Sequence, residues 1–99
     1  MSKSRFGSSR SKSGRLHQLA ARIARSGSSD SHGVYQISKS AAARLAAACR
    51  RGLPRSDDEF KIATGTHRAW KNSTKRDPGW WMLGREGDQY VLTFVFEDW

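Results

Sequence analysis

Apolar residues are concentrated in two runs near the C-terminus of the chain. The runs are Trp80 to Leu83 and Tyr90 to Phe96, and glycines and charged residues occupy the positions between them, 84–88. Such a segment between two apolar runs is typical of a β-hairpin. Alternate residues of 90–96 point to opposite faces of a strand, and both faces are apolar. We therefore expect 90–96 to be a central or covered strand rather than an edge strand.

Two segments have helical periodicity instead. In 13–26, apolar residues recur at helical spacing after Ser13, which is a suitable cap, and Gly27 is a suitable stop. In 39–51, the predicted N-cap is Ser38, and Gly52 is placed to occupy the position after the helix. The small apolar residues of the second helix allow it to approach a sheet closely.

The remaining segments are read as short strands and loops. Residues 34–37 and 60–63 alternate as strands do, and the second strand is expected to resume through 66–70. Loops are predicted at 26–33, 55–59 and 71–79, and the last ends in the turn-forming triplet Asp77-Pro78-Gly79. The sequence thus predicts an α+β fold: two helices packed on one face of a small antiparallel sheet, with a three-stranded C-terminal meander and a further short strand.

Length and composition limit the organisation of the chain. Its 99 residues allow one domain at most, which we place at 13–99, after a flexible basic arm at 1–12. No apolar run approaches the 18 residues of a membrane span and no signal-peptide pattern is present, so we expect a soluble cytoplasmic protein without a membrane partner. A single cysteine and three scattered histidines predict no internal disulfide, no metal site and no cofactor.

Charge is the strongest compositional signal. The chain has 18 Lys and Arg against 9 Asp and Glu, a formal net charge of +9. The basic excess lies in residues 1–55, whereas residues 79–99 are acidic. An excess of this size is typical of proteins that bind polyanions, so we expect a nucleic acid or a ribonucleoprotein as the partner.

The predicted nucleic-acid contacts form two groups, one in the arm and first helix and one in residues 68–76, at the end of the second predicted strand and in the loop that follows it. The first group is Arg10, Lys12, Arg15, Arg22 and Arg25; the second is Arg68, Trp70, Lys71, Lys75 and Arg76. Lys and Arg side chains next to an aromatic residue suit the binding of single-stranded nucleic acid, because an unpaired nucleobase can stack on the aromatic ring. An ordinary amphipathic surface helix explains the first group equally well.

Two adjacent tryptophans add a candidate contact. Trp80 and Trp81 lie on one predicted strand, so their side chains point to opposite faces. At most one of the two side chains can therefore face the core. The other covers a second surface or is exposed, where it is available for contact.

His67 is the candidate for acid–base catalysis. Histidine titrates near neutral pH, and the adjacent Arg68 would lower its pKa and favour the neutral base. Together with Lys61, Lys75 or Arg76 it would form a metal-free ribonuclease site. A plain surface histidine in a basic loop is the alternative. His17 and His32 have no partner at a telling spacing.

These observations leave three functional hypotheses open. The first is a non-enzymatic module that binds single-stranded RNA or DNA. The second is a ribonuclease toxin, because the order of the elements resembles that of small ribosome-dependent toxins of the RelE and ParE type, in which helices precede an antiparallel sheet. The resemblance covers the layout alone and carries over none of that group's functional residues. The third is an inhibitor of the kind found in phages and plasmids, which binds a protein or ribonucleoprotein partner.

Overall fold

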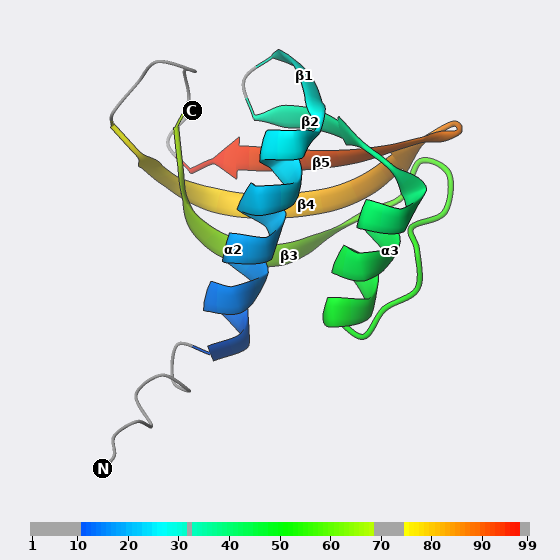
Figure 1. The fold of residues 1–99 in the computed structure, drawn as a ribbon, viewed down its shortest axis with the longest axis horizontal. Helices are drawn as coiled ribbons and strands as arrows, with labels where there is room; N and C mark the ends of the chain where they lie inside the picture. The colour runs from blue at the N-terminus through cyan, green and yellow to red at the C-terminus, as the bar shows by residue number, and fades with distance from the viewer. Residues whose placement is uncertain (1–10, 32, 69–74, 98–99) are drawn as a thin grey trace.

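The computed structural model describes residues 11–31, 33–68 and 75–97 of the chain. Its elements, in chain order, are α2 (Ser11–Ser26), β1 (Ser28–Ser31), β2 (Val34–Ile37), α3 (Lys39–Ala48), β3 (Glu59–His67), β4 (Asp77–Glu86) and β5 (Gln89–Phe96). The strands form one antiparallel sheet in the order β1-β2-β5-β4-β3 (Figure 1). The predicted α+β class is therefore confirmed, and β5 is the central strand, as expected.

The strand β1 is an addition to the predicted sheet. Its sequence, Ser28-Ser29-Asp30-Ser31, lies in the segment predicted as a loop, and it has no alternating apolar residues that would have indicated a strand. It pairs with β2, where Ser28 lies opposite Gln36. The pairing with β2 supplies hydrogen bonds for this polar segment.

The C-terminal hairpin has longer strands and a tighter turn than predicted. β4 and β5 remain paired as far as Glu86 and Gln89, which leaves Gly87 and Asp88 as the turn. Gly87 has φ +60°, a conformation that glycine adopts without steric cost and that hairpin turns require. The apolar pattern predicted the hairpin, whereas the charged ends of the strands gave no signal of their length.

The prediction of a tight turn at Asp77-Pro78-Gly79 was wrong. These residues begin β4 and pair with His67, Thr66 and Gly65 of β3. Proline is tolerated here because it stands near the start of a strand, where a ladder donor is least needed. The third strand likewise runs without interruption to His67, and a bulge at Ile62 shifts its register between Lys61 and Ala63.

The first helix, α2, begins at Ser11, so Lys12 lies in the helix and not before it. Ala20, Ile23 and Ala24 are buried against the sheet, and they form the apolar side that the helical spacing indicated. No helix among the described residues is long and apolar enough to cross a membrane.

The second helix, α3, has the predicted beginning and a different end. Ser38 Oγ accepts a hydrogen bond from the backbone N–H of Ala41 at 3.1 Å, which confirms the N-cap. The helix ends at Ala48, and Arg50, not Gly52, takes the left-handed position with φ 59°. The backbone N–H groups of Arg50 and Arg51 then bond to carbonyls of the last turn at 2.9 Å, as in a Schellman motif.

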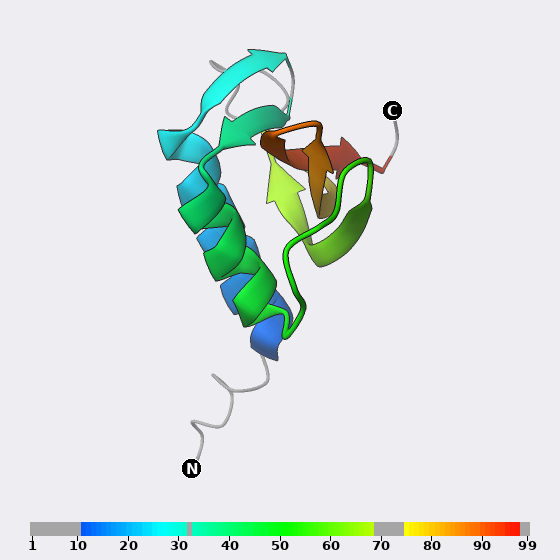
Figure 2. The same cartoon turned by 90° about the vertical axis from the view of Figure 1, so that its right-hand side faces the viewer.

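Both helices lie on the same side of the sheet (Figure 2). The core between these layers contains Trp81 and Leu83 of β4, Leu92 and Phe94 of β5, and Leu45 of α3, each no more than 2% exposed. We call the other side of the sheet the open face. The register places Val34, Trp80, Met82, Val91, Thr93 and Val95 on it, and all six are half-buried.

Candidate functional site

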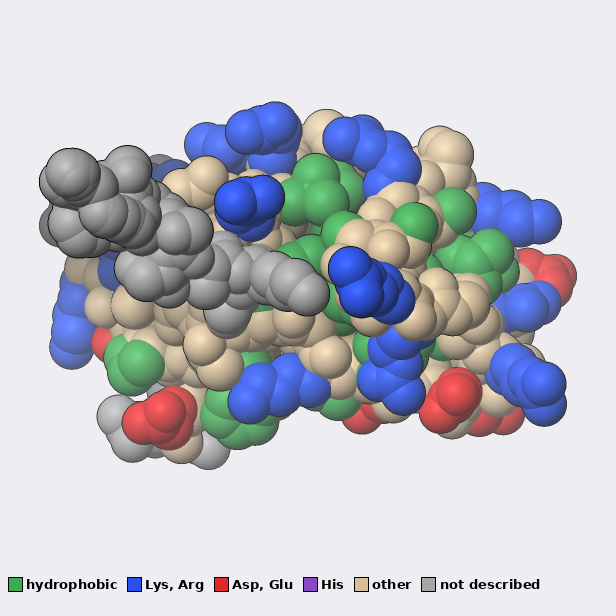
Figure 3. All heavy atoms as spheres, turned by 90° about the horizontal axis from the view of Figure 1, so that it is seen from below, with side chains coloured by type: hydrophobic (Ala, Val, Ile, Leu, Met, Phe, Trp, Pro, Cys, Tyr) green, Lys and Arg blue, Asp and Glu red, His purple; other side chains and the backbone are tan. Residues whose placement is uncertain are grey.

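Three arginines of α2 lie on its exposed side. Arg15, Arg22 and Arg25 are exposed, and none of the three forms an ion pair with the described residues. Figure 3 shows Lys and Arg side chains spread over the face seen from below, whereas Asp and Glu gather toward its lower and right-hand margins. These three arginines therefore add positive charge to the molecular surface.

Three other predicted contacts, Arg10, Trp70 and Lys71, lie outside the described residues. Of the predicted loop contacts that the structure describes, Arg68, Lys75 and Arg76 are exposed. Lys75 Nζ lies 3.7 Å from Asp77 Oδ1, so part of its charge is offset by that carboxylate. The positive charges of Arg76 and Arg68 add to the effect of burial, and both lower the pKa of His67.

His67 is held at the end of β3 by a side chain from the opposite part of the sheet. Its Nε2 lies 2.6 Å from the hydroxyl of Tyr35, a residue of β2. Two strands, β5 and β4, separate β2 from β3, so the contact passes over them on the helix side. Phe94 of β5 and Trp81 of β4 lie under the His67 ring, with centroid distances of 5.3 and 4.9 Å. These contacts fix the ring in one place.

A second histidine approaches the same tryptophan from α2. The indole Nε1–H of Trp81 donates to Nδ1 of His17 at 2.9 Å, although the two residues are 64 positions apart. Because His17 accepts at Nδ1, the proton of the neutral ring is on Nε2. The ring lies against Gly65 of β3, where an added Cβ would meet His17 Cγ and Cε1 at 2.6 Å. Only glycine leaves room for the histidine at this position.

Together these residues form a ring cluster of His17, Tyr35, His67 and Trp81 at the rim of the core. Trp81 is fully buried, and the other three are half-buried. The Trp81 ring lies 6.4 Å from His17 and 6.1 Å from Tyr35, measured between centroids. The buried indole is therefore the common support for three titratable side chains.

The local electrostatics keep both histidines neutral at pH 7. Burial is the largest cause that lowers the pKa of His67, and together with the charges of Arg76, His17 and Arg68, in that order, it brings the pKa to about 4. Burial, followed by Arg76, also lowers the pKa of His17. The sequence predicted that neighbouring cations would depress the pKa of His67, and the structure adds burial as the larger cause.

Tyr35 is shifted in the opposite sense. Burial raises its pKa, and the Arg68 charge partly opposes that effect. At pH 7 the cluster therefore contains a neutral imidazole that accepts a proton, a phenol that donates one, and arginine charges close by. This combination supports acid–base chemistry on an anionic substrate. Within the described part of the chain, no three His, Cys, Asp or Glu side chains come together as a metal site.

Sequence reasoning missed two members of the ring cluster. His17 had no partner at a recognisable spacing, and Tyr35 was noted only as a strand residue. Both are brought to His67 by tertiary contacts between residues 32 or more positions apart. One signal was available in part: Gly65 inside a strand indicates a close approach by another group, but it does not identify that group.

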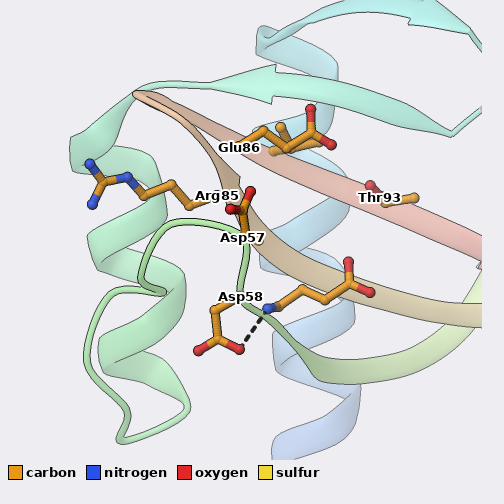
Figure 4. A pocket seen from close by; sticks show the side chains of 8 residues that line it. Asp57, Asp58, Arg85, Glu86 and Thr93 are labelled. Carbon is orange, nitrogen blue, oxygen red and sulfur yellow. Dashed lines mark hydrogen bonds between the residues drawn. The ribbon is translucent and has the colours of Figure 1, made fainter.

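A hollow on the open face has a different character. It has a volume of about 280 Å³ and lies near the turn of the hairpin (Figure 4). Its lining consists of Asp57, Asp58, Glu59, Gly84, Arg85, Glu86, Val91 and Thr93. The backbone N–H of Glu59 donates to Asp58 Oδ1 at 3.0 Å, so one of the carboxylates has a local partner. Four acids against one base make this hollow unfavourable for phosphate groups.

Comparison of the chain with family models, with curated proteins and with solved structures gave no match. The residues of the ring cluster, their distances and their charges are therefore the basis for inferring a function.

Proposed function

We propose that this protein is a small metal-free endoribonuclease with His67 as its general base. The observation that carries the proposal is the environment of His67. The ring is half-buried and hydrogen-bonded to Tyr35, and burial together with the charges of Arg76 and Arg68 lowers its pKa so that it is neutral at pH 7. Such a histidine is suited to taking a proton from a hydroxyl group next to a phosphate. RNA supplies that hydroxyl and that phosphate in every nucleotide, whereas DNA lacks the 2′-hydroxyl.

The proposed reaction leaves the protein with no net change in protons. Nδ1 of His67 accepts the proton of a ribose 2′-hydroxyl, and the 2′ oxygen forms a bond to the adjacent phosphorus. The bond from phosphorus to the 5′ oxygen of the next nucleotide breaks. Tyr35 gives its proton to that oxygen and regains one from Nε2 of His67 across their 2.6 Å hydrogen bond. The products are a 2′,3′-cyclic phosphate and a 5′-hydroxyl.

The two arginines have a double role in this scheme. Arg68 and Arg76 are close enough to lower the pKa of His67, so they are also close enough to attract a phosphate bound beside it. Their charge stabilises the extra negative charge of the transition state. In return, the bound phosphate raises the pKa of His67 from about 4 toward the working pH, which makes the histidine a stronger base when substrate is present.

His17 contributes a neutral donor. Its Nδ1 is occupied by the Trp81 N–H, so Nε2–H remains for a phosphate oxygen. We assign it to substrate positioning and not to proton transfer, because the Trp81 bond holds its tautomer fixed.

The test is cleavage of a single-stranded RNA labelled at both ends, in the presence of a chelator, by the wild-type protein and by H67A purified in parallel. We expect cleavage by the wild type and a loss of roughly 10²–10⁴-fold in H67A. Y35F, which keeps the ring and removes the hydroxyl, should lose activity while it retains RNA binding. Intact RNA with the wild type, or equal cleavage by H67A, would overturn the proposal.

A second candidate function is nucleic-acid binding without cleavage. It is favoured by Arg15, Arg22 and Arg25, which are exposed and available on α2. Replacing all three with alanine should weaken binding of single-stranded RNA severalfold and reduce its salt dependence. An unchanged dissociation constant would remove α2 from the binding surface and leave the ring cluster as the contact.

A further inference from the structure

Trp80 occupies an unusual position for a large aromatic residue. It is adjacent in sequence to the fully buried Trp81, but it lies on the open face, where it is half-buried. Its neighbours across the strands are Val95 of β5 and Thr64 of β3. Neither helix covers this side of the sheet (Figure 2). The core therefore does not account for the indole of Trp80.

A basic side chain accompanies it. Nζ of Lys61, which is exposed, lies 5.7 Å from the centroid of the Trp80 ring. The sheet register places Lys61 opposite Met82 and Thr64 opposite Trp80. Lys61 and Trp80 therefore lie on neighbouring strands and on the same face of the sheet, the open face. An aromatic surface next to an ammonium group is the combination that proteins use for unpaired nucleotides, because the ring stacks on the base and the cation pairs with phosphate.

We propose that Trp80 and Lys61 form a subsite for an unpaired base of the RNA strand whose scissile phosphate lies at His67. This inference rests on the proposed ribonuclease function and adds the substrate class, which is single-stranded RNA. A base in a duplex is stacked and paired, so it is not free to lie on the indole.

The edge strand β3 connects the two sites. It is the last strand of the sheet, and no further strand among the described residues covers it. His67 is on the helix side of β3, and Thr64, opposite Trp80, is three residues earlier on the open face. The distance along the strand is about 10 Å at roughly 3.3 Å per residue. A single strand that passes around this edge reaches both sites within a few nucleotides.

Charge limits how far the strand extends over the open face. The acidic hollow, lined by Asp57, Asp58, Glu59 and Glu86, lies toward the hairpin turn. Phosphate groups are repelled there, so the strand is confined to the end of the face that carries Trp80 and Lys61. The acidic hollow thus gives the subsite a boundary on one side.

The experiment measures binding of a fluorescent single-stranded 2′-O-methyl RNA, which has no free 2′-hydroxyl and is not cleaved by the proposed reaction. The variants are W80A, W80F as the conservative replacement, and M82A as a control on the same face. We expect W80A to bind about 5- to 150-fold more weakly, the equivalent of about 1–3 kcal/mol per stacked base. W80F should remain within a few-fold of the wild type, and M82A should be unchanged. Folding of each variant is checked by circular dichroism.

The outcomes separate this inference from the function on which it rests. Cleavage of RNA by the wild type with equal probe affinity in W80A, W80F and wild type would overturn the subsite and keep the nuclease. Equal weakening in W80A and M82A would also overturn it, since the open face would then respond as a general apolar surface suited to a protein partner. Failure of the wild type to bind the probe and to cleave RNA would overturn both proposals.

Discussion

The two faces of the sheet use neighbouring residues for opposite purposes. Trp81 faces the helices, is fully buried and supports His17, Tyr35 and His67. Trp80, the preceding residue, faces away from the helices and has a lysine beside its ring. The alternation of a strand is enough to produce this difference. One strand therefore contributes the support of the candidate catalytic cluster on one face and a candidate contact surface on the other.

The comparison also explains the uneven charge of the chain. The helix side carries the exposed arginines of α2 and the His67 ring on which Arg68 and Arg76 act, whereas the open face ends in an acidic hollow. A protein with a net charge of +9 does not attract polyanions equally over its whole surface. The position of the few acids decides where a phosphate backbone is excluded.

The largest expected difference between the faces is in stability. W81A removes a fully buried indole and its hydrogen bond to His17, so it should lower the free energy of unfolding by about 3–5 kcal/mol. W80A removes a half-buried ring and should cost at most about 2 kcal/mol. Urea unfolding of the two variants measures both values. Equal losses would contradict the assignment of Trp81 to the core and Trp80 to the open face.

The next effect concerns the support of His17. G65A places a methyl group against the imidazole ring, which must move and give up the Trp81 hydrogen bond. We expect a loss of about 1–3 kcal/mol in the free energy of unfolding, together with reduced RNA cleavage. G52A is the matched control, because nothing lies within 4 Å of a Cβ at that position. Similar results for the two variants would show that His17 does not depend on the space at Gly65.

The smallest effect is the pH dependence that His67 imparts. Its pKa is about 4 in the folded protein, below the ordinary value of 6.5, so the unfolded chain binds more protons between these values. The contribution to stability is complete above pH 6.5 and is lost as the pH falls through about 4. H67Q lacks this proton-binding group. Between pH 7 and pH 4.5, the free energy of unfolding of the wild type should therefore fall by about 1–2 kcal/mol more than that of H67Q. Parallel curves would contradict the burial of a neutral His67.

Most of the fold was predictable from the sequence because local patterns determined it. The alternation in 90–96, the helical spacing in 13–26 and the cap at Ser38 correspond to β5, α2 and the start of α3. The errors occurred where partners decide the conformation. β1 is polar and depends on β2, and Asp77-Pro78-Gly79 is extended because β3 pairs with it. Propensity describes a residue alone, so it cannot include a neighbour that is distant in sequence.

The candidate site was predictable only in part, for the same reason. His67 was identified from its own chemistry and from the adjacent Arg68. His17 and Tyr35 lie 50 and 32 positions away from it, and only the folded sheet brings them together on Trp81. The prediction that one of the two adjacent tryptophans would lie outside the core was correct, but the sequence did not indicate which.

The proposed role of His67 is to activate a ribose 2′-hydroxyl, and cleavage of a chimeric substrate would show whether it does so. The substrate is a single-stranded DNA with one ribonucleotide, incubated with wild type and with H67A, and its products are analysed by mass spectrometry. We expect the wild type to make one cut, on the 3′ side of the ribonucleotide, which leaves a 2′,3′-cyclic phosphate on one product and a 5′-hydroxyl on the other. We expect no cut by H67A. Cleavage at deoxynucleotides, or a cut at the ribonucleotide that persists in H67A, would contradict the proposed role of His67.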